Sequence, residues 1–185
     1  MYVSAGRGLA LLRMAFGLYF VSYALDKTLN GWLTSAGPMT AFLFGNPNAT
    51  PPTRGAVVNS TPFYADFLTN VVQPNPGLFS TLVVLGEWVA GILLLLGLLT
   101  RFGSIVGIIL NLNYVFMKGL PANGGSLDRL FLAAEIVFLL AAAGLVWGLD
   151  GSLRQQLAGN PVTRWLAGLG GPAPATEEPP QRVPA

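Results

Sequence analysis

The chain has 185 residues, of which 52% are hydrophobic and only 10% are charged, with a formal net charge of +2. Because a soluble domain usually carries about 25% charged residues, this composition excludes a water-soluble globular protein and predicts an integral membrane protein in contact with lipid. So small a charge gives no indication of nucleic-acid binding. The chain contains no Cys and no His, which excludes thiolate and imidazole ligands for iron–sulfur clusters, haem or other metals. We therefore expect no intrinsic cofactor and no metal site, so a redox centre must belong to a partner or be a diffusible lipid-soluble molecule.

The first predicted membrane-spanning helix covers about residues 7–29, "RGLALLRMAFGLYFVSYALDKTL". Its apolar run is long for a signal peptide, and no small-residue cleavage site follows, so we expect the helix to be retained. Arg13 lies in the inner half of this helix, and we expect its long side chain to reach the cytoplasmic head groups.

A long outer loop is predicted for residues 31–77, and it is expected to contain short amphipathic helices. Thr61 is a suitable N-cap, Pro62 is a suitable first helical residue, and apolar residues then recur at helical spacing. This pattern predicts a helix that lies on the membrane interface or covers the end of the bundle. A second short helix is predicted at residues 37–45.

Three further spans are predicted at about residues 78–100, 102–119 and 127–149, since each is long enough to cross about 30 Å of hydrocarbon. The predicted fold is therefore an all-α, integral membrane four-helix bundle, occupying residues 1–151. Residues 152–169 read as an amphipathic interfacial segment. Residues 170–185 are rich in Pro, Gly and Ala, which predicts a disordered tail.

Four spans place both termini on the same side of the membrane. Six of the ten basic residues fall on that side, and the excess predicts cytoplasmic termini in a prokaryotic inner membrane.

Polar residues within the predicted spans gather in the outer half of the bundle. Glu87 lies about 13 Å below the outer surface, and Glu135 lies about 10 Å below it, at a rise of 1.5 Å per residue. Carboxylates in hydrocarbon need a partner, a proton or a task, so we take these two as candidate catalytic residues. The candidate quinone-binding or substrate-binding residues are Lys27, Asn111, Tyr114 and Lys118.

A structural interpretation stands beside this functional one. A buried glutamate can accept a quinol proton or donate to a quinone carbonyl, but it can equally hold two helices together by pairing with Lys27 or Lys118. The lysines lie near helix ends, where they commonly reach the head groups. Asn111 is equally suited to an interhelical hydrogen bond.

Three stretches resemble the DoxX-like membrane proteins, and especially the DoxD branch, the small subunit of thiosulfate:quinone oxidoreductase. They are "RMAFGLYFVSYALDKTLNGW", "LGEWVAGILLLLGLLTRFGS" and "LDRLFLAAEIVFLLAAAGLVWGLDG". The resemblance covers about residues 7–151 and implies a four-helix bundle that works beside a redox partner in quinone-linked metabolism of sulfur compounds. The residues that match the family pattern are Arg13, Lys27, Glu87, Arg101, Glu135 and Asp150.

The leading hypothesis is a membrane subunit of a quinone-linked oxidoreductase complex, with quinone as a diffusible substrate. The main alternative is a non-catalytic accessory or anchoring subunit of a larger respiratory or photosynthetic complex. A small-solute carrier is a third alternative, although no inverted repeat is visible. Each of the first two hypotheses requires a larger protein partner as well as membrane lipid.

Overall fold

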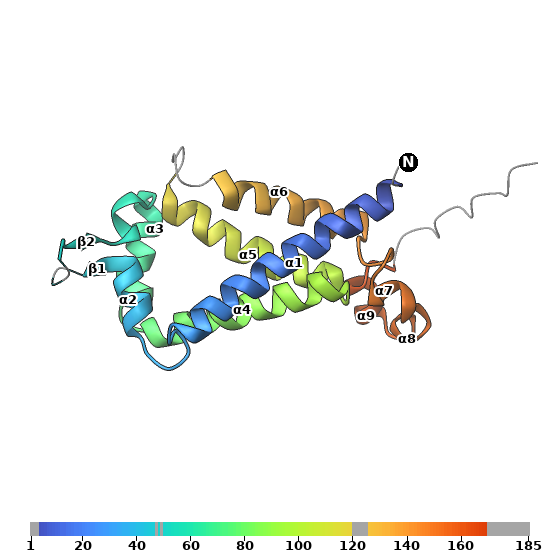
Figure 1. Cartoon of the computed structure of the whole chain (residues 1–185), viewed down its shortest axis with the longest axis horizontal. Helices are drawn as coiled ribbons and strands as arrows, with labels where there is room; N and C mark the ends of the chain where they lie inside the picture. The colour runs from blue at the N-terminus through green and yellow to red at the C-terminus, as the bar shows by residue number, and fades with distance from the viewer. Residues whose placement is uncertain (1–3, 47, 49, 120–125, 170–185) are drawn as a thin grey trace, which may run out of the picture.

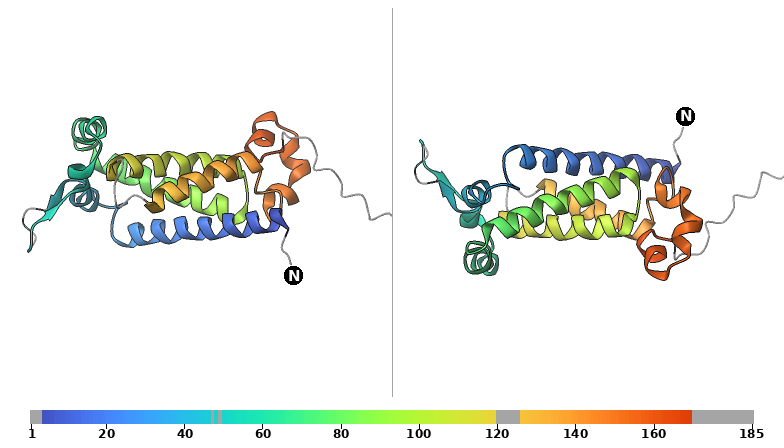
Figure 2. Two further views of the ribbon diagram at one scale, coloured as in Figure 1. Left: turned by 90° about the horizontal axis from the view of Figure 1, so that it is seen from above. Right: turned by 90° about the horizontal axis from the view of Figure 1, so that it is seen from below.

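The computed structural model describes residues 4–46, 48, 50–119 and 126–169. Long helices run side by side and form the body of the molecule (Figures 1 and 2). Within the described residues these long helices are α1 (Ala5–Leu29), α4 (Pro76–Leu96), α5 (Thr100–Lys118) and α6 (Ser126–Ala141). Of them, α1, α4 and α5 are long and apolar enough to cross a membrane. The prediction of a membrane protein is therefore supported by three candidate spans.

The long helices pack in the order α1, α4, α5 and α6, with the main contacts between neighbours in that order. The α1–α4 contact is a close one, because Gly17 and Gly91 face each other across it. A Cβ atom on Gly17 would lie 2.9 Å from the carbonyl oxygen of Gly91, and a Cβ on Gly91 would lie 2.8 Å from the backbone nitrogen of Val21. Such small-residue contacts let two helix backbones approach closely where apolar burial offers no net gain.

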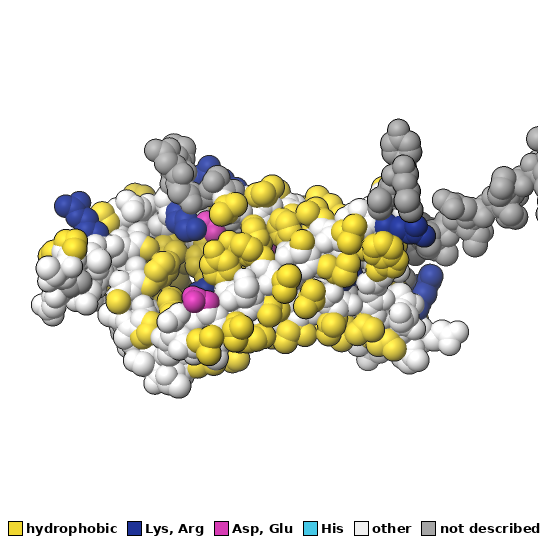
Figure 3. All heavy atoms as spheres, viewed as in Figure 1, with side chains coloured by type: hydrophobic (Ala, Val, Ile, Leu, Met, Phe, Trp, Pro, Cys, Tyr) yellow, Lys and Arg dark blue, Asp and Glu magenta, His cyan; other side chains and the backbone are white. Residues whose placement is uncertain are grey.

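The hydrophobic side chains of the body face outwards as well as inwards. Leu18, Leu85 and Ile109 are each at least half exposed. Figure 3 shows yellow apolar side chains along the length of the long helices, whereas the visible Lys and Arg side chains gather towards the ends. An apolar belt between charged ends is the surface expected of a protein that spans lipid.

One end of the body, here called the loop end, is covered by the segment between α1 and α4. This segment contains α2 (Gly37–Phe44), the 3₁₀ helix η1 (Ala56–Asn59), α3 (Pro62–Phe67) and the π-helical turn η2 (Leu68–Val72). The two-residue strands β1 (Gly45–Asn46) and β2 (Thr53–Arg54) form a small antiparallel hairpin that the sequence did not predict, with Gly45 opposite Arg54.

The covering segment is fixed to the end of α5 by hydrogen bonds. The backbone nitrogen of Thr61 donates to the carbonyl oxygen of Phe116 at 3.0 Å. The hydroxyl of Ser60 donates to the carbonyl oxygen of Met117, also at 3.0 Å. Tyr64, Leu68 and other apolar side chains of the segment are buried against the helices. In the structure this segment packs across the end of the long helices.

The opposite end, here called the terminal end, holds the start of α1 and three short helices (Figure 1). These are α7 (Leu149–Ser152), α8 (Arg154–Ala158) and α9 (Pro161–Leu166). The fourth long helix was predicted to reach residue 149, but α6 ends at Ala141. Ala142 then takes a left-handed φ of 48°, and the chain turns back across the bundle end. The predicted tail, 170–185, lies outside the described residues.

The turned-back segment carries Asp150 to the first turn of α5. Its carboxylate accepts from the backbone nitrogens of Leu99 and Thr100, at 2.6 and 2.9 Å, and from the Thr100 hydroxyl at 2.7 Å. A carboxylate at a helix N-terminus satisfies donors that have no partner within the helix. Asp150 therefore caps α5 from a distant part of the chain.

Arg13 is fully buried at the same end, so the expectation that it reaches the head groups is wrong. Its guanidinium donates to the carbonyl oxygens of Leu94, at 2.5 Å, and Trp147, at 3.1 Å. Gly97 makes room for it, since a Cβ there would lie 2.6 Å from Arg13 Cζ. The physical reason is that the last carbonyls of α4 have no helical partners and attract a cation.

Candidate functional site

A polar cavity of about 280 Å³ opens at the loop end, between α1, α4, α5 and α6. Aromatic side chains form much of its wall, and charged side chains stand among them. The charged and amide-bearing lining residues are Asp26, Lys27, Glu87, Asn111, Lys118 and Asp128. Five of the six candidate residues from the sequence line this cavity, namely Lys27, Glu87, Asn111, Tyr114 and Lys118. Glu135 is the exception.

An ion pair between Lys27 and Glu87 forms the deepest charged part of this site. The Lys27 ammonium lies 2.5 Å from Glu87 Oε1 and 2.7 Å from Oε2, and the two side chains are 12% and 2% exposed. Lys27 belongs to the last turn of α1, and Glu87 lies in the middle of α4. The two residues meet because α1 and α4 pack closely. Partnering of this kind is what allows a carboxylate to stay so far from water.

Tyr114 adds a third group to the pair. Its hydroxyl donates to Glu87 Oε1 at 2.8 Å from α5, so three helices converge on a single carboxylate. One Glu87 oxygen thus accepts from both an ammonium and a phenol. A ligand in the cavity can compete for any of these donors, which gives the site a set of exchangeable hydrogen bonds.

Three aromatic rings lie close to the Lys27 ammonium. Its nitrogen lies 5.3 Å from the ring centre of Tyr23, 5.6 Å from Trp32 and 5.8 Å from Tyr114. Ring faces attract cations at such distances, most strongly where water is excluded. The rings therefore hold the ammonium in place while leaving the cavity itself apolar enough for a flat organic molecule.

A second ion pair forms the outer part of the cavity wall. The Lys118 ammonium lies 2.5 Å from Asp128 Oδ2, and it also lies 5.8 Å from the ring centre of Tyr114. Lys118 is 37% exposed, far more than Lys27. Of the neighbours that the sequence offered to Glu87, the structure pairs it with Lys27, whereas Lys118 pairs across to α6.

Glu135 does not line the cavity but lies behind it. Its Oε1 accepts from the amide nitrogen of Asn111 at 2.8 Å, and a Cβ on Gly107 would lie 2.7 Å from its Cδ. The side chain is fully buried, and its Oε2 has no hydrogen-bond partner among the described residues. Asn111 both lines the cavity and bonds to this carboxyl, so it links Glu135 to the site.

Sequence reasoning missed several aromatic members of the site. Trp32 and Phe42 come from the covering segment, and Phe131 comes from α6. The only signal in the sequence was that Trp32 follows the end of the first helix closely, where its ring can fold back over the helix end. Phe42 gives no such signal, because its position depends on how the segment folds.

A family model described as "TQO small subunit DoxD" matches residues 9–169. The matched range includes every residue that lines the polar cavity, together with the buried Arg13 and Asp150 of the terminal end. No solved structure matches the chain.

Proposed function

The chain belongs to the DoxD family of TQO small subunits, and from this membership we propose that its polar cavity binds the head group of a quinone. The chain is a membrane subunit of a complex of the thiosulfate:quinone oxidoreductase type. In such a complex thiosulfate is the electron donor and quinone the acceptor. The proposal concerns where the acceptor binds.

The observation that carries the proposal is the convergence of Lys27, Glu87 and Tyr114 on the wall of one cavity. A quinone head presents two carbonyl oxygens on a flat ring. An ammonium and a phenol can donate to such an oxygen, and the aromatic wall suits the ring. Ordinary ligand sites combine the same elements, namely an apolar concave wall and a few converging polar groups.

The same residues provide for the protons of the reaction. Reduction of a quinone to a quinol adds two electrons, supplied by thiosulfate, and two protons. As negative charge develops on the ring oxygen, Lys27 or Tyr114 stabilises it by hydrogen bonding, and either group can pass it a proton. Glu87 then relays a replacement proton from bulk solvent to whichever of the two groups donated it, and the second proton reaches the quinone by the same route.

The electron-carrying group is proposed to belong to a partner subunit. Without Cys or His, the chain offers none of the usual haem or iron–sulfur ligands. We further propose that α6 is a fourth span and that both termini are cytoplasmic in a prokaryotic plasma membrane, as the distribution of basic residues favours. The polar cavity then lies in the outer half of the bilayer.

The test is quinone reduction by the complex isolated from its native membrane. Glu87→Gln keeps the volume and removes the charge, and it is expected to lower turnover by tenfold or more. Asp66→Asn is the matched control, because Asp66 is an exposed carboxylate on the covering segment and does not line the polar cavity. Tyr114→Phe removes only a hydroxyl, and it should slow turnover without removing the partner of Lys27.

Assembly must be measured on the same samples, because an unpaired buried ammonium destabilises a protein. Complexes that contain Glu87→Gln in normal amounts but reduce quinone slowly support the proposal. If Glu87→Gln and Tyr114→Phe both retain normal turnover in an assembled complex, the proposal is wrong. That result would favour the alternative, a subunit that anchors the complex without taking part in the reaction.

A further inference from the structure

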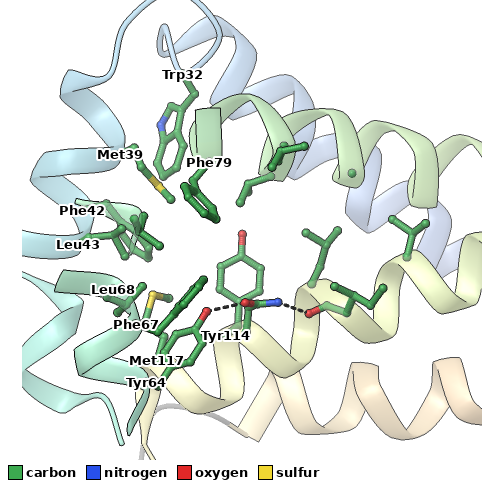
Figure 4. Close-up of a pocket in the computed structure, with 18 residues that line it drawn as sticks. Trp32, Met39, Phe42, Leu43, Tyr64, Phe67, Leu68, Phe79, Tyr114 and Met117 are labelled. Carbon is green, nitrogen blue, oxygen red and sulfur yellow. Dashed lines mark hydrogen bonds between the residues drawn. The ribbon is translucent and has the colours of Figure 1, made fainter. Parts of the chain in front are cut away.

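A second cavity, of about 360 Å³, lies beside the polar one at the loop end. It is bounded by α4 and α5 and roofed by the covering segment, and Figure 4 shows the aromatic side chains that surround it. The rings of Trp32, Phe42 and Tyr114 line both cavities. The two cavities are thus neighbours that share a wall. We call the second one the apolar cavity.

Three polar side chains in the wall of the apolar cavity, Tyr64, Asn113 and Tyr114, are already bonded within the protein. Tyr64 donates to Asn113 Oδ1 at 2.5 Å, and the Asn113 amide donates to the carbonyl oxygen of Ile109 at 2.5 Å (Figure 4). Burial also raises the pKa of Tyr64 to about 12, so its hydroxyl stays neutral. Tyr114 donates to Glu87. The wall therefore offers an incoming molecule chiefly hydrocarbon and ring surface, which suits an apolar chain.

The apolar cavity also reaches the lipid-facing surface. Leu82 of α4 and Ile109 of α5 both line it, and they are 54% and 55% exposed. In a protein that spans a membrane, exposed apolar side chains on these helices face hydrocarbon. The hydrocarbon chain of a molecule dissolved in the bilayer can therefore enter the apolar cavity between α4 and α5 without crossing water.

We propose that the apolar cavity holds the isoprenoid tail of the quinone whose head group lies in the polar cavity. A polar cavity and an apolar cavity that share a wall fit the two ends of one amphiphile. The shared wall, and Tyr114 in particular, then lies where head and tail join. This inference rests on the proposed function, and it adds that the chain selects quinones by their tail as well as by their head.

The test is to fill the apolar cavity without changing the polar one. Gly86 lines the apolar cavity, and the atoms nearest to a Cβ there would be side-chain atoms of Leu110, at 3.4 Å, which is ordinary van der Waals contact. Gly86→Leu therefore directs a side chain into the space. Gly77→Leu is the matched control on the same helix, because nothing lies within 4 Å of a Cβ at Gly77. Gly86→Ala adds a single methyl group and gives an intermediate step.

Two quinones with the same head group, one with a long isoprenoid tail and one without a tail, are compared in the isolated complex. Gly86→Leu is expected to lower kcat/KM for the tailed quinone at least tenfold and to change that for the tailless quinone less than twofold. Gly77→Leu should change neither, and Glu87→Gln should lower both. Normal turnover of the tailless quinone also shows that the filled variant is folded. Equal effects of Gly86→Leu on both quinones, or no effect on either, overturn the inference.

A binding measurement separates this inference from the proposed function. Lipids extracted from the purified complex are identified by mass spectrometry, and the tailed quinone should be bound in the wild type and lost in Gly86→Leu. If Glu87→Gln and Tyr114→Phe both leave turnover normal while this loss is still seen, the proposed function fails and the tail site stands. If the molecule lost on filling is a phospholipid instead, the tail inference is wrong.

Discussion

Asp150 connects the turned-back segment after α6 to the first turn of α5, and its replacement measures how much this end of the fold depends on a single carboxylate. Its two oxygens accept three hydrogen bonds, two from Thr100 and one from the backbone of Leu99. Asp150 and Thr100 are fully buried, so water cannot readily replace a lost acceptor. Asp150→Ala therefore leaves two buried donors on Thr100 and a partly buried one on Leu99.

The magnitude follows from those three donors. A buried donor without a partner costs about 1–3 kcal/mol, so the two on Thr100 cost about 2–6 kcal/mol together. The Leu99 donor can find water and adds about 0.5–1.5 kcal/mol. Relaxation reduces the total, and we expect a loss near the lower end, about 3 kcal/mol. Since whole domains are stable by about 5–15 kcal/mol, this is a large fraction.

Asp150→Asn distinguishes hydrogen bonding from mere packing. The single amide oxygen can take the place of Oδ2 and keep both bonds from Thr100, which leaves only the Leu99 donor facing an NH₂ group. We expect this variant to lose about 1–2 kcal/mol, less than Asp150→Ala.

The assay is unfolding of the purified protein in mild detergent, titrated with a denaturing detergent and followed by the helical circular dichroism signal. Ser152→Ala is the control, because the Ser152 hydroxyl makes only an exposed 3.4 Å bond to a carbonyl in the same turn. The reasoning is refuted if Asp150→Ala unfolds within about 0.5 kcal/mol of the wild type, or if Asp150→Asn is the less stable of the two.

Two further predictions concern the bundle interior. Gly17→Ala places a methyl group against the backbone of Leu95, so we expect a loss of about 1–3 kcal/mol. Gly8→Ala, where nothing lies within 4 Å, should lose nothing in the same unfolding titration, and equal behaviour of the two variants would contradict the close contact. Glu135→Gln keeps an oxygen for Asn111 and removes an acid that has no cationic partner among the described residues. The unfolding midpoint of this variant should equal or exceed that of the wild type, and a marked fall would show that the carboxyl of Glu135 has a stabilising partner in the folded protein.

Much of the helical plan is visible in the sequence because lipid imposes a length and a composition on each span. The first three long helices follow the predicted boundaries within a few residues, since Pro76 begins α4 and Gly97, with a φ of 63°, ends it. The end of α6 could not be predicted, because "GLVWGLDG" is as apolar as a span. The segment after α6 turns back because Trp147 accepts a hydrogen bond from Arg13 of α1 and Asp150 accepts one from Thr100 of α5.

For the candidate site, the sequence predicted only that certain polar residues lie at a similar depth in the membrane. Helical spacing places Asn111, Tyr114 and Lys118 on one face of α5, and all three do line the polar cavity. Spacing within one helix cannot say which neighbour that face meets. The pairing of Lys27 with Glu87, and the position of Glu135 behind Asn111, depend on how closely the helices pack at their glycines.

The buried charges at the two ends of the bundle differ in what they touch, and this difference separates structure from function. Arg13 and Asp150 bond to backbone groups at the ends of α4 and α5, groups that no ligand can replace without unravelling a helix. Lys27 and Glu87 bond to each other, and Glu87 also accepts from the Tyr114 hydroxyl. These bonds lie beside a cavity, and every partner is a side chain that can exchange its bond for one to a bound molecule. Arg13 and Asp150 are thus expected to govern stability and Lys27 and Glu87 to govern turnover, although all four lie within the same family match.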